Sequence, residues 1–227
     1  MFIDDRAFLR LHVEAVWGVQ LPPLDHDDVS LLPGSLLPSW RLCAAEVATD
    51  RVCIWRPDVD EAQREELLVR LNEALLLPSS NPPLPGISRE VAFRLTAEPL
   101  IEFAVARRAA RPLVPDDYAL IEAFEPGSAA YFLQPECRPA IGVLVDGRLC
   151  SIAHSSRRTR EACELGINTL PEARRKGYAL AATVAWSAAI VQEGLTPIYS
   201  ALATNTPSLN LACAAGYREI ARAVTLE

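Results

Sequence analysis

The chain has 227 residues, a length that suits one or two domains. Half of the residues are hydrophobic and 22% are charged, which excludes an intrinsically disordered chain, and ten glycines with six scattered cysteines exclude collagen-like and disulfide-rich scaffolds. No apolar run reaches the roughly 18 residues of a membrane helix, and acidic residues stand where a secretory signal is basic. We therefore expect a cytoplasmic protein without a membrane partner.

The charges are distributed unevenly along the chain. The formal net charge is −7, and residues 1–100 carry all of this excess, with 16 acidic residues and 9 arginines. Residues 101–227 are balanced, with 13 acidic and 13 basic residues, so we expect no nucleic-acid partner held by bulk charge. The cysteines and histidines lack the spacing of a zinc site, and we expect no metal.

Residues 1–100 predict a small α+β domain of unknown role. Two β-prone runs, 41–47 and 51–55, flank a short turn and suit a hairpin. Asp58 has the position of an N-cap before an amphipathic helix. The proline-rich segment 78–86 then predicts a linker or an extended loop.

Residues 101–227 predict a second domain in which helices pack on a sheet. Asp146-Gly147 is a strong signal for a two-residue hairpin turn. The expected elements are a short helix at 114–124, a hairpin of 140–145 and 148–153, a strand at 162–170, a helix at 177–192, a strand at 197–202, a helix at 207–215 and a strand at 217–225.

The junction before the helix at 177–192 has the features of a pyrophosphate-binding loop. Unpaired N–H groups at a helix start carry partial positive charge, and Arg174, Arg175 and Lys176, the one lysine of the chain, precede them. Gly177 lets an anion approach the backbone, and Ala179 is small for the same purpose. The loop lacks the Gly-Lys-Ser/Thr ending of the phosphate-binding loop of nucleotide triphosphatases. It also lacks the three-glycine pattern of dinucleotide-binding proteins.

These residues resemble the GNAT superfamily of acyl-CoA-dependent N-acetyltransferases. The family's loop reads Gln/Arg-x-x-Gly-x-Gly/Ala, and Arg174-Arg175-Lys176-Gly177-Tyr178-Ala179 matches it. Asn205 and Ser208, followed by Gly216-Tyr217, are similar to the family's downstream Asn-x-x-Ser and Gly-aromatic pair. The resemblance covers about residues 104–227 and implies a GNAT-like α+β fold, with a mixed central sheet flanked by helices. It also implies that the loop, Asn205 and Ser208 bind acetyl-CoA as cosubstrate.

The resemblance implies direct attack of an amine on the acetyl thioester, which forms a tetrahedral oxyanion and releases the CoA thiolate. In such folds the pantetheine arm lies against the strand before the loop, here near the backbone of Ile167 and Thr169. Glu164 on that strand is the candidate base by its position. His154, at the end of the preceding strand, is the rival because the ordinary pKa of histidine is near neutral.

The position at which many family members place the acid, a tyrosine, is Ala212 in this chain. Tyr178, Tyr199, Ser200, Tyr217 or solvent could replace it. Without that hydroxyl, a non-catalytic acyl-CoA-binding or sensing module is the alternative to an N-acetyltransferase.

Several properties of the ligands stay open. The acceptor could be a small amine, an amino acid, an antibiotic or a protein terminus, and the acidic first half favours a cationic one. The acyl chain could be longer than acetyl, and the assembly could be a homodimer.

Overall fold

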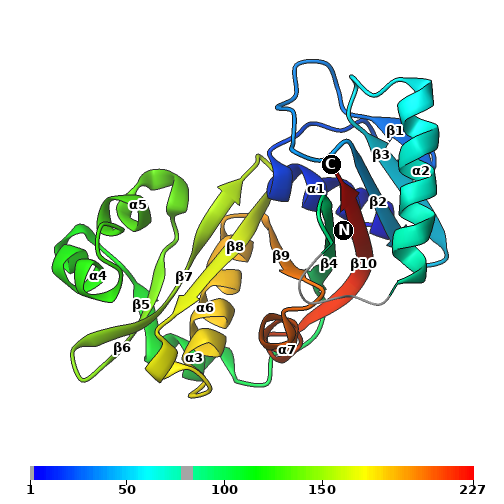
Figure 1. The fold of residues 1–227 in the computed structure, drawn as a ribbon. Coiled ribbons are helices and arrows are strands. Elements are labelled where there is room, and N and C mark those ends of the chain that lie inside the picture. Colours follow the sequence, from blue (N-terminus) through cyan, green and yellow to red (C-terminus); the bar gives the residue numbers. More distant parts are fainter. Residues whose placement is uncertain (1–2, 78–83) are drawn as a thin grey trace. The chain divides into compact units, whose positions relative to one another are not determined.

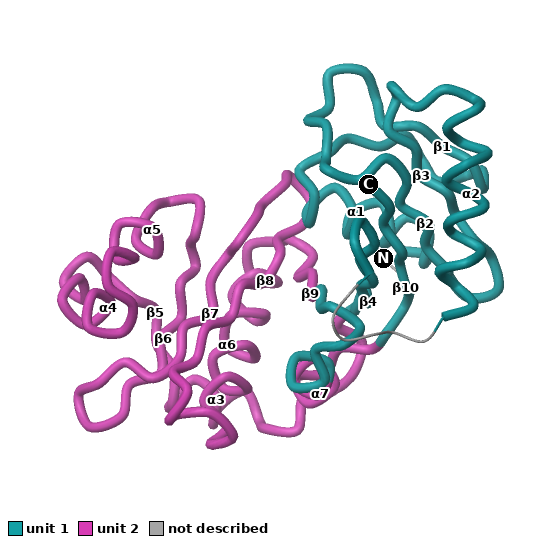
Figure 2. The backbone as a smooth tube through the Cα atoms, viewed as in Figure 1, with its two compact units in different colours: residues 1–94, 200–209, 219–227 teal, residues 95–199, 210–218 magenta. Residues whose placement is uncertain are grey.

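The computed structural model describes residues 3–77 and 84–227, which form two compact units (Figures 1 and 2). Unit 1 consists of residues 1–94, 200–209 and 219–227, and unit 2 consists of residues 95–199 and 210–218. Most of the proline-rich segment expected as a linker, residues 78–83, lies outside the described residues.

The sheet of unit 1 has the strand order β1-β3-β2-β10-β4. β2 and β3 form the predicted antiparallel hairpin, and β10 runs antiparallel to β2 with Leu226 opposite Leu42. The final strand of the chain therefore lies inside this sheet, between β2 and β4 (Figure 1). The bounds are β1 (Asp28–Ser30), β2 (Leu42–Val47), β3 (Asp50–Trp55), β4 (Ile87–Leu95) and β10 (Tyr217–Leu226).

Side chains of β2 alternate between two apolar layers. Cys43 and Ala45 are buried with side chains of helix α1 (Asp5–Trp17), whereas Leu42 and Ala44 are buried with those of α2 (Glu61–Leu76). The sheet of unit 1 is thus covered by one helix on each face.

The start of α2 differs from the prediction. Asp60, and not Asp58, is the N-cap, and it forms a reciprocal capping box with Gln63. The Asp58 carboxylate is instead held by the guanidinium of Arg56, with Nε 2.7 Å from Oδ1. The prediction of Asp58 as N-cap is therefore wrong, because an ion pair competes for its side chain.

The sheet of unit 2 has the strand order β9-β8-β7-β6-β5, with β8 and β9 parallel and the other pairs antiparallel. Asp146 and Gly147 join β6 to β7 with φ angles of 50° and 74°, which confirms the predicted two-residue turn. The bounds are β5 (Ala110–Pro112), β6 (Ile141–Val145), β7 (Arg148–Arg158), β8 (Ala162–Thr169) and β9 (Thr196–Leu202).

Helices cover both faces of this second sheet. On one face Trp186 of α6 (Tyr178–Gln192) donates a hydrogen bond to Ser155 of β7, and α3 (Phe103–Ala109) packs beside α6. On the other face Ile152 of β7 packs with α4 (Tyr118–Phe124) and α5 (Ala129–Leu133). Short 3₁₀ turns η1 (Pro115–Asp117), η2 (Pro135–Cys137) and η3 (Pro171–Ala173) and helix α7 (Thr206–Ala214) complete the elements.

A mixed sheet flanked by helices confirms the predicted α+β fold class. Within the part of the chain that the structure describes, no helix has the length and hydropathy needed to cross a bilayer.

Candidate functional site

The loop between β8 and α6 leaves the start of the helix open. Gly177 is the N-cap of α6 with a φ of 82°, in the left-handed region that favours glycine, and it offers no capping side chain. Among the described residues, no atom lies within 4 Å of the place that a Cβ on Gly177 would occupy. The first N–H groups of this 15-residue helix therefore face accessible space, the arrangement that binds anions.

The three cations of the loop are exposed beside this helix start. The Nε atom of Arg174 lies 3.5 Å from the carbonyl oxygen of Thr169, a long hydrogen bond. Arg175 and Lys176 form no hydrogen bond or ion pair with any other described residue, and nearby Glu172 pairs with Arg148. The predicted phosphate loop thus keeps positive charge available to a ligand.

β8 presents a free edge next to this loop. In the described strand pairs, β8 pairs with β9 only over residues 162–164, and from Leu165 to Thr169 it pairs with β7 alone. The Leu170 N–H donates to the Cys150 carbonyl of β7. By the two-residue alternation of a strand, the peptide groups of Ile167 and Thr169 then point away from β7, toward the free edge.

Both candidate bases lie on the face of β7 and β8 that α4 and α5 cover. His154 is paired with Gly166, and its ring lies so close that a Cβ on Gly166 would be 2.2 Å from His154 Cε1. Asn168, two residues further along β8, donates a hydrogen bond to Glu125 after α4. Glu164 shares this face because residues 164, 166 and 168 alternate with those that face α6.

The Glu164 carboxylate is buried and held in a fixed orientation. Its side chain is 9% exposed, and its Oε2 atom accepts hydrogen bonds from Ser156 Oγ at 2.8 Å and Arg157 Nη1 at 3.1 Å. These partners come from the end of β7, where the pairing with β8 shifts between Ser155 and Arg157. The irregularity brings two successive β7 side chains onto one carboxylate.

His154 is neutral at physiological pH. Burial lowers its pKa to about 4, although the nearby Gly166 backbone opposes the shift. Its Nε2 atom lies 3.2 Å from the hydroxyl of Tyr131 on α5. Burial raises the pKa of Tyr131 to about 12, so the phenol keeps its proton at neutral pH.

Tyr131 was not among the residues predicted from the sequence. Its side chain is 43% exposed, and the charges of Glu164 and Arg157 are close enough to act on its pKa. Its helix α5 has only five residues, which are too few to show a helical period of hydrophobic residues in the sequence. The structure thus adds a protonated hydroxyl to the two predicted bases.

A pocket of about 490 Å³ lies at the end of β7, next to the side chains that hold the Glu164 carboxylate. Ser156 and Arg157, which hold the Glu164 carboxylate, are part of its wall. The remaining lining residues are Glu136, Arg158, Thr159 and Arg160. This pocket could not be predicted from the sequence.

Asn205 and Ser208 lie in a segment that belongs to unit 1, whereas the phosphate loop belongs to unit 2. The Asn205 side chain accepts the Ser208 N–H at 3.2 Å, at the start of α7. Their assignment to the CoA site stays a prediction.

The alternative acids differ in their exposure. Ala212 is fully buried and provides no hydroxyl. Tyr199 is buried, and the buried hydroxyl of Tyr217 lies 2.7 Å from Ser187 Oγ. Tyr178, the first residue of α6, is half-buried, and Ser200 belongs to unit 1. Tyr199 and Tyr217 are thus sealed inside unit 2, unlike Tyr131.

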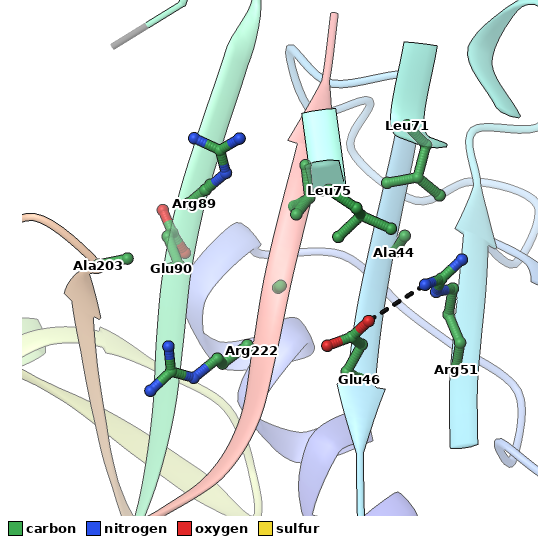
Figure 3. Close-up of a pocket in the computed structure, with 11 residues that line it drawn as sticks. Ala44, Glu46, Arg51, Leu71, Leu75, Arg89, Glu90, Ala203 and Arg222 are labelled. Atoms are coloured by element: carbon green, nitrogen blue, oxygen red, sulfur yellow. Dashed lines mark hydrogen bonds and ion pairs between the residues drawn. The ribbon is translucent and has the colours of Figure 1, made fainter. Parts of the chain in front are cut away.

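A smaller pocket of about 110 Å³ lies in unit 1 between α2 and the sheet (Figure 3). It is lined by charged side chains that already have partners within the protein. Arg51 bonds to Glu46 at 3.1 Å, Arg222 pairs with Glu219, and Arg89 donates to the Ala74 carbonyl. We assign no chemistry to this pocket.

The fold and the loop define an α+β protein with an open helix start beside an open strand edge. Residues 138–224 match the family model described as GNAT acetyltransferase, which confirms the predicted resemblance. Over this segment the chain is similar to the GNAT acetyltransferases.

Solved structures share the fold at low sequence identity. A GNAT-family acetyltransferase from Colwellia psychrerythraea is 14% identical over 77% of this chain and 75% of that one, with a TM-score of 0.53. A GCN5-related N-acetyltransferase from Sphaerobacter thermophilus is 15% identical over 82% of this chain and 76% of that one, with a TM-score of 0.50. A comparison with curated proteins found no match.

Proposed function

We propose that this chain is an N-acetyltransferase that transfers an acetyl group from acetyl-CoA to an amine acceptor by direct attack. The observation that carries the proposal is the open start of α6 beside the free edge of β8. The N–H groups of Tyr178 and Ala179, with Arg174, Arg175 and Lys176, suit the pyrophosphate. The outward peptide groups of Ile167 and Thr169 suit the amides of an extended pantetheine arm, which would add to the strand edge.

The proposed base is Glu164. An amine is protonated at neutral pH and attacks only after it loses a proton, which a carboxylate can accept directly or through a water. His154 is the rival acceptor, but its Nε2 atom is engaged by Tyr131. Glu164 borders the pocket through Ser156 and Arg157, which favours it over His154.

The proposed acid is Tyr131. The departing thiolate must take a proton from a side chain or from solvent, and Ala212 has no hydroxyl that could donate one. The Tyr131 hydroxyl carries a proton at neutral pH, is partly exposed and lies on the same face as both candidate bases. Tyr131→Phe should lower kcat with little change in CoA affinity.

The experiment is a titration of free thiol after incubation of the purified chain with acetyl-CoA and a panel of amines. Acceptor-dependent release of CoA supports the transferase. Failure to bind CoA in calorimetry would overturn the proposal, because the loop would then not be a CoA site. A series of longer acyl-CoA thioesters in the same assay defines the acyl chain.

A non-catalytic acyl-CoA-binding module is the second candidate, and Ala212 is the observation that favours it. Tight CoA binding without thiol release for any acceptor would support this candidate. Cytoplasmic location and a homodimer stay predictions.

A further inference from the structure

We propose that the pocket beside Glu164 binds an anionic group of the acceptor, so that the acceptor is an amine that also carries a carboxylate or a phosphate. The inference rests on the proposed N-acetyltransferase function and narrows its substrate class. It is carried by the side chains at the end of β7 and in the turn that follows.

The turn after β7 holds Arg160 in an ordered, exposed position. Thr159 Oγ1 accepts the N–H groups of Glu161 at 3.2 Å and Ala162 at 3.0 Å, and the Thr159 N–H donates to the Ala162 carbonyl. Arg160 lies inside this turn and forms no hydrogen bond or ion pair with any other described residue. Its five N–H donors are therefore available to a ligand.

The other two arginines of the pocket differ in what they can offer. Arg158 is engaged by Glu193 and by the carbonyl oxygen of Arg138, so its role is structural. Arg157 contacts Glu164 through Nη1, but its side chain is 55% exposed, which leaves donors of its guanidinium accessible. Arg160, assisted by Arg157, can thus bind a carboxylate or a phosphate in the two-pronged manner of a guanidinium.

The pocket couples anion binding to the chemistry. Ser156 and Arg157 both line the pocket and bond to the Glu164 carboxylate, so an acceptor whose anion contacts Arg160 brings its amine toward the proposed base. Glu136 is the one acidic residue of the lining, where three arginines outnumber it.

The test compares matched acceptors that differ in one anionic group. L-Amino acids are compared with their amides, and phosphoethanolamine is compared with ethanolamine, so that the two arms separate a carboxylate from a phosphate. Thiol release gives kcat/KM for each compound, and calorimetry gives binding even where turnover is absent. Arg160→Gln is the test variant. Arg108→Gln, an exposed arginine in the last turn of α3, is the matched control.

We expect acceptors with the anion to be preferred, and we expect Arg160→Gln to reduce that preference by about tenfold to a hundredfold, the effect of one charge-assisted contact. Arg108→Gln should keep the preference. The inference would be overturned if kcat/KM were equal for amino acids and their amides and also for phosphoethanolamine and ethanolamine. An unchanged preference in Arg160→Gln would overturn it as well. CoA binding with no binding of any anionic amine also overturns it. If the unaltered protein does not bind CoA, the proposed function itself is refuted. Calorimetry of the amines alone still tests the pocket in that case.

Discussion

Gly177→Val tests whether the start of α6 holds the pyrophosphate. Gly177 has a φ of 82°, which costs an L-residue about 1–2 kcal/mol, and a branched side chain there would project into the open space above the helix N–H groups. Each hydrogen bond from a backbone N–H to a charged phosphate contributes roughly 1.5–3 kcal/mol. Loss of two such bonds would weaken CoA binding by roughly 10²- to 10⁴-fold.

The chain offers a matched control at the other end of the same helix. Gly194 also has a left-handed φ, 79°, and among the described residues nothing lies within 4 Å of its Cβ position. Gly194→Val should therefore lose a similar amount of stability, measured by denaturant unfolding, while CoA affinity in calorimetry stays near that of the unaltered protein. If both variants lose affinity equally, the effect is on stability alone. If Gly177→Val binds CoA normally, the helix start is not the pyrophosphate site.

Four further predictions concern the site and its support. Glu164→Gln should lower the acetyl-transfer rate by about 10²- to 10⁴-fold with CoA affinity nearly unchanged, and an unchanged rate would reassign the base. Lys176 is the one lysine, so an amine-directed reagent should label it and the N-terminus. Saturating CoA should protect Lys176, and equal labelling with and without CoA would show that it is merely solvated. Gly166→Ala should destabilise the fold by about 1–3 kcal/mol because its Cβ meets the His154 ring, and His154→Ala in the same chain should relieve part of the loss in denaturant titrations. Burial lowers the pKa of His154 to about 4, so the unfolded state binds more protons between about pH 6.5 and pH 4 and stability is lost as the pH falls through that window. His154→Gln should reduce the slope of the unfolding free energy against pH there, leaving the contribution of buried His12, whose pKa burial also lowers to about 4, and an unchanged slope would contradict the assigned burial.

Local chemistry explains why part of the fold could be predicted from the sequence. The turn at Asp146-Gly147 needs two positive φ angles, which these residue types favour, and the structure has both. The capping aspartate was placed two residues early, because the sequence does not reveal that Arg56 holds Asp58. The helix α1 was not predicted at all. Its sequence nevertheless alternates apolar and polar residues with a helical period, and seven of its thirteen residues are buried, so the pattern was available in the sequence.

In the candidate site, too, features set by neighbouring residues could be predicted from the sequence, and features set by contacts between distant residues could not. The phosphate loop is contiguous, so its cations and Gly177 could be identified as a unit. The partners of Glu164 could not, because Ser156 and Arg157 reach it through an irregularity in the pairing of β7 and β8. Tyr131 meets His154 across 23 positions of the chain, a pairing that only the packed fold creates.

The position of β10 has a consequence for synthesis of the chain. This strand lies between β2 and β4, yet roughly 120 residues separate its start from the end of β4. At about 5–20 residues per second, a ribosome needs roughly 6–25 s to make that stretch. During this time the facing edges of β2 and β4 lack the strand that joins them, and unpaired edges invite association with other chains. A nascent chain should therefore need a chaperone in this interval. A fragment that stops before residue 219 should keep the exposed edges permanently and aggregate.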